Sequence, residues 1–410
     1  MTVGRAGSAI GQRLTANVLV ILLFFALRIP LLIVRQPFFD ELFTRWIAAR
    51  SFAGILGALR YDSGPPLYYC IVHLMGDPPV AVLRCVSLLF ATIALAALLA
   101  RKQIVAAALL AVFPPAVLFA VDSRAYALCA MFVTMGVLLI DDRPYLSALS
   151  FVAAAYSHYY GALLIPLSLG RGWRGAPGER RPSIKTFALS VLLFAPGVWL
   201  ALHQPRESVA WIGPFPQWPE ALFARPPIWL LILAAVLIVA AGYRLNRFAA
   251  MTLIPLAIAL VLRIYFPLRF ESVIAAPFVL WIAASARKVL IAPLLAIGVA
   301  ISAIGIIDHA QRPVDDYRAA AEFVRSAPGT VVASGYLYLE TISLRPAVAF
   351  PPEQAVHPGW RATATSASGL PRGPFIWIGE RYAPELALIE RSRRTTPLFV
   401  YGRAAVVRVN

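Results

Sequence analysis

The sequence predicts an α-helical polytopic membrane protein with about eleven transmembrane helices, followed by a small C-terminal α/β domain outside the cytoplasm. Of its 410 residues, 60% are hydrophobic and only 14% are charged, and the mean hydropathy is +0.74. Long apolar runs recur as far as Ile307, and the composition changes after that residue. This balance is typical of a chain that faces lipid, and it excludes a wholly soluble protein.

The apolar runs define the expected transmembrane helices. They cover residues 17–34, 79–100, 103–119, 125–140, 144–157, 160–170, 184–202, 227–243, 248–265, 270–286 and 289–307. The fifth and sixth runs are shorter than the ~20 residues that a bilayer requires. We therefore expect these two segments to tilt, break or re-enter the membrane.

Basic residues between alternate runs set the expected orientation. All three lysines, Lys102, Lys185 and Lys288, fall in such loops, together with many of the arginines. Positive charge favours the cytoplasmic side, which places the N-terminus in the cytoplasm. An odd number of spans then places the C-terminal domain outside, in the periplasm of a cell whose inner membrane holds the protein. The net charge of +17 is thus explained by topology, and no nucleic-acid partner is expected.

The sequence divides into an expected transmembrane catalytic domain, residues 1–307, and an expected α/β domain, residues 308–410. The second part has helical periodicity in 315–324 and near 384–391. Short strand patterns cover 330–333, 374–378, 397–401 and 404–409. About 100 residues are enough for an independent core.

Polar stretches on the expected outer side hold most of the candidate functional residues. These stretches are 35–78, 121–124, 157–160 and 203–226, with a short turn at 263–269. The first contains Asp40-Glu41, directly after an apolar run. Two neighbouring carboxylates at a membrane exit are costly unless they face water, cations or substrate. The alternative is an interfacial anchor or a helix N-cap.

The order of the short motifs resembles that of the GT-C superfamily of membrane glycosyltransferases, of the protein mannosyltransferase and aminoarabinose-transferase type. In chain order the motifs are Arg28, Asp40-Glu41, the turn Pro65-Pro66-Leu67-Tyr68-Tyr69, the stretch from Gly76 to Arg84, Arg124-Ala125-Tyr126-Ala127-Leu128, His158-Tyr159 and Arg269-Phe270. The resemblance covers residues 17–170 well and 260–310 weakly. Two positions depart from it: Gly64 stands where His or Lys is frequent, and Phe270 stands where Tyr is usual.

This resemblance implies transfer of a sugar from a polyprenyl-phosphate donor to an acceptor outside the cytoplasm, which is a glycan, lipid A or a protein. Besides donor and acceptor, membrane lipids are the expected partners. The chemistry of the residues fits, because an attacking hydroxyl must lose its proton to a nearby base. Asp40 is the candidate base, and Glu41 is expected to orient Asp40 or to hold the acceptor.

The leaving group is a phosphate, so cations should stabilise its developing charge. Arg124 and Arg269 are the candidates, because a guanidinium grips phosphate through two hydrogen bonds. Either could instead be an arginine that extends to the membrane interface.

Four further residues are expected to contact substrate: Asp62, Tyr126, His158 and Tyr159. Asp62 could instead cap a helix, and a histidine among tyrosines is often only a structural hydrogen-bonding group. We expect no metal, because His203 with Glu207 and His309 with Asp308 form no convincing ligand set. No cofactor is expected either.

A polytopic lipid or glycan transporter or flippase is the competing interpretation. Transporters place charges at the bilayer midplane and often have repeated halves. Here the charges gather at the outer ends of the apolar runs, and the sequence has no visible repeat. A membrane scaffold with an outer binding domain is a third interpretation, which leaves the acidic pair and the arginines without a role.

Overall fold

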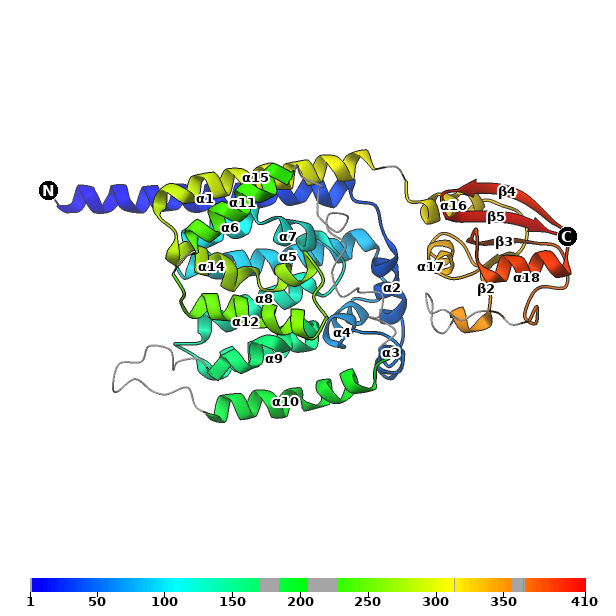
Figure 1. Ribbon diagram of the computed structural model, residues 1–410, viewed down its shortest axis with the longest axis horizontal. Coiled ribbons are helices and arrows are strands. Elements are labelled where there is room, and N and C mark those ends of the chain that lie inside the picture. Colours follow the sequence, from blue (N-terminus) through cyan, green and yellow to red (C-terminus); the bar gives the residue numbers. More distant parts are fainter. Residues whose placement is uncertain are drawn as a thin grey trace. The chain divides into compact units, whose positions relative to one another are not determined.

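A computed structural model of the protein describes residues 2–169, 184–205, 228–242, 244–312, 314–355, 364 and 366–410. The chain forms two compact units (Figure 1). The first consists of Met1–Arg35 and Asp62–Gln311, and the second of Gln36–Tyr61 and Arg312–Asn410. A segment of the first outer loop therefore belongs with the C-terminal residues. The domain division at 307 and 308 remains a prediction, and it does not anticipate this segment.

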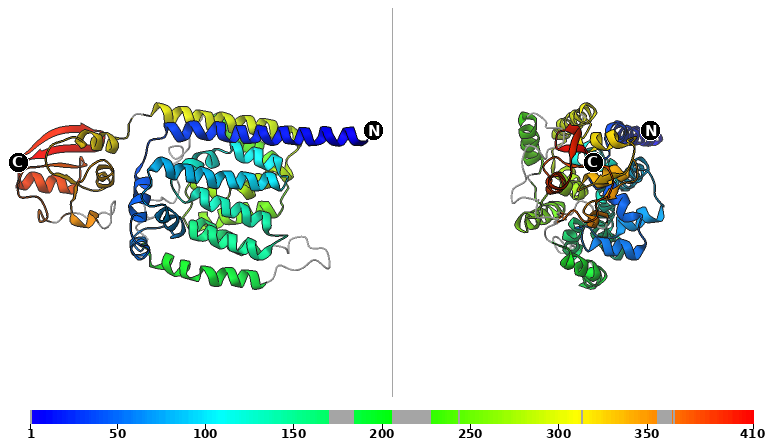
Figure 2. Two further views of the ribbon diagram at one scale, coloured as in Figure 1. Left: turned by 180° about the vertical axis from the view of Figure 1, so that it is seen from behind. Right: turned by 90° about the vertical axis from the view of Figure 1, so that its right-hand side faces the viewer.

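The first unit is helical throughout its described residues. Its α-helices are α1 (Thr2–Val34), α4 (Leu67–Leu74), α5 (Val80–Ala100), α6 (Ile104–Val112), α7 (Pro114–Leu118), α8 (Tyr126–Leu139), α9 (Pro144–Ser157), α10 (Ile184–His203), α11 (Ile228–Ala241), α12 (Arg247–Val261), α13 (Arg269–Val273), α14 (Ala275–Ser285) and α15 (Lys288–Gln311). Two short 3-10 segments, η1 (Phe119–Val121) and η2 (Tyr159–Leu169), complete it. The first and last of the long helices, α1 and α15, pack side by side (Figure 2).

Every apolar run predicted from the sequence contains a helical segment in this unit. Within the described residues, four helices are long and apolar enough to cross a membrane. The bent pair α6 and α7 makes a fifth span if it is counted as one. The α-helical membrane architecture is thus confirmed in its coarse form, and the number of eleven spans remains a prediction.

The bend between α6 and α7 amounts to 71°. It falls at Phe113-Pro114-Pro115, where two prolines cannot supply the backbone N–H groups that would continue α6. A helix end inside an apolar core leaves carbonyl groups without helical partners, and each must find another donor.

The side chain of Arg28 on α1 supplies those donors. It is fully buried. Its Nη1 donates to the carbonyl oxygens of Ala111 at 2.8 Å and Phe24 at 3.1 Å, and its Nη2 donates to those of Leu110 at 3.3 Å and Ala116 at 3.2 Å. The guanidinium carbon also lies 3.7 Å from the centroid of the Phe24 ring. One arginine therefore joins α1 to both sides of the bend.

Small residues allow α8, α9 and η2 to approach closely. A Cβ atom at Gly136 would lie 2.7 Å from the Phe151 ring, and one at Gly161 would lie 2.5 Å from the backbone of Ala154. The Ser147 hydroxyl donates to the Gly136 carbonyl at 2.7 Å across the first of these contacts. This packing fixes the connection between α9 and η2, which carries His158 and Tyr159.

The second unit holds a five-stranded sheet in its described residues, in the order β2-β1-β3-β5-β4. The strands are β1 (Val331–Ala333), β2 (Val348–Ala349), β3 (Phe375–Glu380), β4 (Thr395–Tyr401) and β5 (Ala404–Val409). β1 pairs in parallel with β2 and β3, whereas β5 runs antiparallel to β3 and β4. Its helices are α2 (Phe39–Ala48), α3 (Phe52–Leu59), α16 (Asp316–Val324), α17 (Leu337–Ile342) and α18 (Pro384–Ser392).

The core of this sheet is built on Trp377 of β3, which is fully buried. It packs in one apolar cluster with residues of the neighbouring strands and of α18. Its indole N–H donates to the Ser334 hydroxyl at 2.9 Å, so the one polar atom of the ring is satisfied. Leu386 and Ile389 of α18 pack in the same cluster. The predicted strands and the two predicted helices are confirmed, while α17 and β2 were not anticipated.

We expect Arg28→Met to destabilise the protein by on the order of 3 kcal/mol, because it leaves several buried carbonyl groups without donors. Thermal unfolding of the purified protein in detergent measures this loss. Arg247→Met is the matched control, since Arg247 pairs with Asp141 where both side chains are well exposed. Exposed pairs contribute about 1 kcal/mol or less. Equal unfolding midpoints for the two variants would contradict the role given to Arg28.

Candidate functional site

Three of the predicted site residues of the first unit meet around the Tyr126 ring, at the start of α8. The His158 ring centroid lies 5.0 Å from that of Tyr126, and the Arg269 guanidinium carbon lies 5.8 Å from it. Arg269 also lies 4.6 Å from the Phe266 ring. Three elements, α8, the α9–η2 connection and α13, thus bring an imidazole, a phenol and a guanidinium together.

A second group of site residues is linked by hydrogen bonds. The Tyr69 hydroxyl donates to Asp62 Oδ2 at 3.0 Å, and Arg124 Nη1 donates to the Tyr69 oxygen at 3.4 Å. Tyr159 is coupled to this group by charge: burial raises the pKa of its hydroxyl most, and the Asp62 carboxylate raises it further. Tyr69 was not selected as a site residue from the sequence, although it ends the Pro-Pro-Leu-Tyr-Tyr turn.

His158 connects the two groups. Burial, and then the charges of Arg124 and Arg269, hold the pKa of His158 well below its usual value near 6.5. The backbone N–H of Tyr160 donates to its Nδ1 at 3.2 Å. The imidazole is therefore neutral at physiological pH, with Nδ1 as an acceptor and the proton on Nε2.

Asp122, two residues before Arg124, could have competed with an anion for that arginine. Its buried carboxylate forms an ion pair with Arg35 at 3.6 Å, at the end of α1. The Arg35 carbonyl in turn accepts a hydrogen bond from Arg84 at 2.6 Å. This chain of contacts ties α1, α5 and the turn before α8 together at the same end of the unit.

The turn before α13 sets the direction of Arg269. Leu268 has φ +67°, a left-handed conformation that is rare for residues other than glycine and often marks a functional turn. Phe270 is fully buried against Tyr160 and Tyr265, with ring centroids 5.1 and 5.8 Å away. The phenylalanine at this position therefore fills an apolar contact with two tyrosine rings.

Glu271, also on α13, was missed in the sequence analysis. The Tyr265 hydroxyl donates to its Oε1. The signal was its position two residues after Arg269, next to the short turn 263–269. Glu271 therefore places a carboxyl group beside the aromatic rings of Tyr265 and Phe270.

Asp40 and Glu41 lie in the second unit, in the first turn of α2. The N-cap of this helix is Phe38, which makes no side-chain cap hydrogen bond, so the N-cap interpretation of the acidic pair is wrong. Asp40 is half-buried, and Glu41 is fully buried. Carboxylates in the first turn are favoured by the positive end of the helix dipole. The six substrate-binding candidates all lie in the first unit.

Asp62 is not a helix cap either, because α4 begins at Leu67 with Pro66 as its N-cap. In the described part of the chain, no group of three or more His, Cys, Asp or Glu side chains could hold a metal ion. Glu207 lies outside the described residues. The expectation of a metal-free site remains a prediction.

No protein-family model matches this chain, and no curated protein matches it. Two solved structures do match. The crystal structure of ArnT from Cupriavidus metallidurans bound to undecaprenyl phosphate has a TM-score of 0.58 and 13% sequence identity, and the alignment covers 98% of each chain. The structure of the same protein in the apo state has a TM-score of 0.57 with the same identity and coverage.

The chain has the fold of ArnT. The match extends over both the helical part and the small C-terminal sheet, because 98% of the chain is covered. The helical fold with a small C-terminal sheet that the motifs implied is therefore confirmed.

We expect His158→Asn to change how stability depends on pH. The folded wild type holds the imidazole neutral, so protonation favours the unfolded state, and stability should fall as the pH drops below about 6.5. Asparagine has no titrating group but can accept the Tyr160 N–H. The variant should therefore lose much of the wild-type decrease in unfolding temperature between pH 7 and pH 5. His73→Asn on α4 is the matched control, and an unchanged slope in His158→Asn would contradict the assignment.

Proposed function

We propose that the protein is a membrane glycosyltransferase that transfers a sugar from a polyprenyl-phosphate donor to an acceptor outside the cytoplasm. The observation that carries this proposal is the convergence of Arg124, Arg269, His158 and Tyr126 at one end of a helical unit with the fold of ArnT. ArnT is an aminoarabinose transferase of the GT-C superfamily, and its structure was solved with undecaprenyl phosphate bound.

The arginines would bind the donor phosphate. The charges of both guanidinium groups act on the His158 imidazole, which supports a shared anion site for them. Because the His158 imidazole is neutral and carries its proton on Nε2, it would donate one hydrogen bond to the phosphate without adding a third positive charge. Tyr126 would orient the Arg269 guanidinium through contact with its ring face.

In the proposed reaction, the oxygen of an acceptor hydroxyl attacks the anomeric carbon of the donor sugar as the bond from that carbon to the phosphate oxygen breaks. The electron pair of the broken bond leaves with the polyprenyl phosphate, and its charge is stabilised by the two arginines. The acceptor proton passes to the Asp40 carboxylate, and the configuration at the anomeric carbon inverts. Glu41 would orient Asp40 or hold the acceptor.

The linked residues Asp62, Tyr69 and Tyr159 would bind hydroxyl groups of the sugar. Asp62 already accepts the Tyr69 hydroxyl, which leaves further lone pairs of its carboxylate available to an incoming donor group. The acceptor class, whether glycan, lipid A or protein, is part of the proposal, as is the choice of a hexosyl or pentosyl donor.

The proposed topology has the N-terminus in the cytoplasm of a cell with an inner membrane and the α/β unit on the outer side. Reporter fusions after residues 60, 125 and 310 should then all report outside. A cytoplasmic report after residue 310 would overturn this topology. A transporter or flippase would move intact donor lipid across vesicles without releasing polyprenyl phosphate, so the two functions have different products.

We expect Asp40→Asn to lower the rate of transfer by about 100-fold or more, because the amide cannot accept the acceptor proton. Donor binding should be unchanged, since the substitution keeps the volume of the side chain. Turnover is measured by mass spectrometry of the lipid products. Asp77→Asn, at an exposed carboxylate outside the candidate site, is the matched control. Wild-type turnover by Asp40→Asn would exclude Asp40 as the base.

We expect Arg124→Ala to weaken donor binding by about 1.5–3 kcal/mol, the loss of a charge-assisted hydrogen bond, which corresponds to about 10- to 150-fold in affinity. Arg124→Lys should recover only part of this, because lysine keeps the charge but not the planar fork. Titration of undecaprenyl phosphate into each purified variant gives the affinities. Arg287→Ala, at an exposed arginine, serves as the control. Equal affinity in all proteins would make Arg124 purely structural.

A further inference from the structure

The helix that carries the acidic pair belongs to the same compact unit as the C-terminal α/β domain. α2 packs against α17. The Phe39 ring, next to Asp40, meets the edge of the Tyr336 ring with centroids 4.6 Å apart and planes at 82°. This T-shaped geometry is a favourable arrangement for an aromatic pair. It fixes the first residue of α2 on the start of α17.

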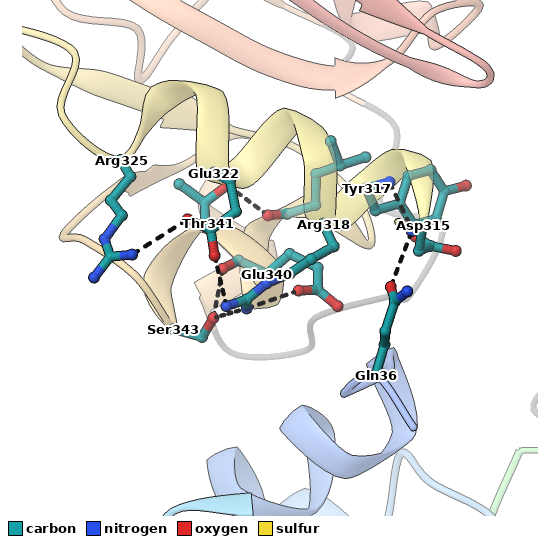
Figure 3. A network of polar contacts seen from close by, with 10 residues as sticks. Gln36, Asp315, Tyr317, Arg318, Glu322, Arg325, Glu340, Thr341 and Ser343 are labelled. Atoms are coloured by element: carbon teal, nitrogen blue, oxygen red, sulfur yellow. Dashed lines mark hydrogen bonds and ion pairs between the residues drawn. The ribbon is translucent and has the colours of Figure 1, made fainter. Parts of the chain in front are cut away.

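A second contact joins the segment before α2 to the segment before α16. The Gln36 side chain donates through Nε2 to the Arg312 carbonyl at 3.5 Å, and its Oε1 accepts the backbone N–H of Asp315 at 3.2 Å (Figure 3). Asp315 is itself the N-cap of α16, with its side chain accepting the Tyr317 N–H at 2.9 Å. This hydrogen bond joins Gln36, before α2, to Asp315, before α16, and the two residues are 279 positions apart in sequence.

A third contact is electrostatic. Glu41 on α2 and Glu340 on α17 are both buried, and Arg318 Nη1 lies 3.5 Å from Glu340 Oε2 (Figure 3). Burial is the largest cause that raises the pKa of Glu340, to about 7, and the charges of Asp315 and Glu41 raise it further while Arg318 lowers it. The ionisation of the Glu340 carboxyl on α17 is therefore sensitive to the charge of Glu41 on α2.

We infer that the C-terminal domain positions the acidic pair, with Tyr336 and Glu340 as the positioning residues that hold α2. This inference rests on the proposed function. A helix of ten residues is marginal by itself, so its conformation depends on the surface against which it packs. A general base also has to be held within a fraction of an ångström of its productive geometry. Tyr336 and Glu340, which lie 296 and 300 positions after Asp40, would thus act on the reaction through Asp40.

The full-length protein tests this with Tyr336→Ala, Tyr336→Phe and the control Tyr382→Ala, since Tyr382 is a highly exposed tyrosine of the same unit. Hydrogen exchange of the peptide that covers residues 39–48 reports the order of α2, whether or not a substrate is known. We expect Tyr336→Ala to lose protection in this peptide and to lower kcat by about tenfold, with the KM for donor changed less than twofold. Tyr336→Phe keeps the ring contact and should behave as the wild type, as should Tyr382→Ala.

Glu340→Gln is the second variant, and it nearly preserves the shape of the side chain. In the wild type, the neutral form of Glu340 favours the folded contact, so this stabilisation is lost as the pH rises through about 7. Protection of residues 39–48 should therefore fall as the pH rises from about 5 to about 7 in the wild type and change less in Glu340→Gln.

Wild-type protection and kcat in Tyr336→Ala would overturn the inference, and so would a lowered kcat with α2 protection unchanged. If Glu340→Gln shows the same pH dependence of protection as the wild type, Glu340 is not a positioning residue for α2. If the wild type releases no polyprenyl phosphate from any donor, the proposed function fails. In that case loss of protection in Tyr336→Ala still supports the contact between α2 and the domain, and unchanged protection excludes it.

Discussion

The first unit depends on the buried guanidinium group of Arg28. Arg28 satisfies carbonyl groups on both sides of the bend between α6 and α7, where the apolar surroundings offer no water. Without that bend, the chain after Val112 would continue in the direction of α6. Because of the bend, the chain turns through α7 and η1 to Asp122. The ion pair between Asp122 and Arg35 then holds this part of the chain against the end of α1. The position of Arg124, and so of the proposed phosphate site, follows from these two contacts.

The proposed chemistry separates two tasks between the two units. The first unit gathers positive charge and aromatic rings, which suits the recognition of a phosphate and a sugar. The second unit carries the acidic pair Asp40-Glu41, in the first turn of a short helix that packs on α17.

Local pattern was enough to predict much of this structure. Apolar runs predicted the helices of the first unit, because hydrophobicity over about 20 residues is a strong signal. The strands around Trp377 followed from short stretches of β-branched and aromatic residues between turns. The link from Asp62 through Tyr69 to Arg124 could not be predicted, because Tyr69 and Arg124 lie 55 positions apart and meet only through side-chain geometry. The packing of α2 with the C-terminal residues could not be predicted either, because nothing in the sequence around Phe39 identifies Tyr336 as the ring that Phe39 contacts. The bend at Phe113 had a visible cause in its two prolines, but the role of Arg28 there depends on tertiary packing.

The most direct measurement incubates the purified protein with a panel of polyprenyl-phosphate sugars and candidate acceptors, and follows the lipids by mass spectrometry. The account predicts that at least one donor is converted to free polyprenyl phosphate, with the sugar recovered on an acceptor in the inverted configuration. Binding of polyprenyl phosphate without conversion of any donor, together with movement of intact donor across vesicles, would contradict it and identify a transporter.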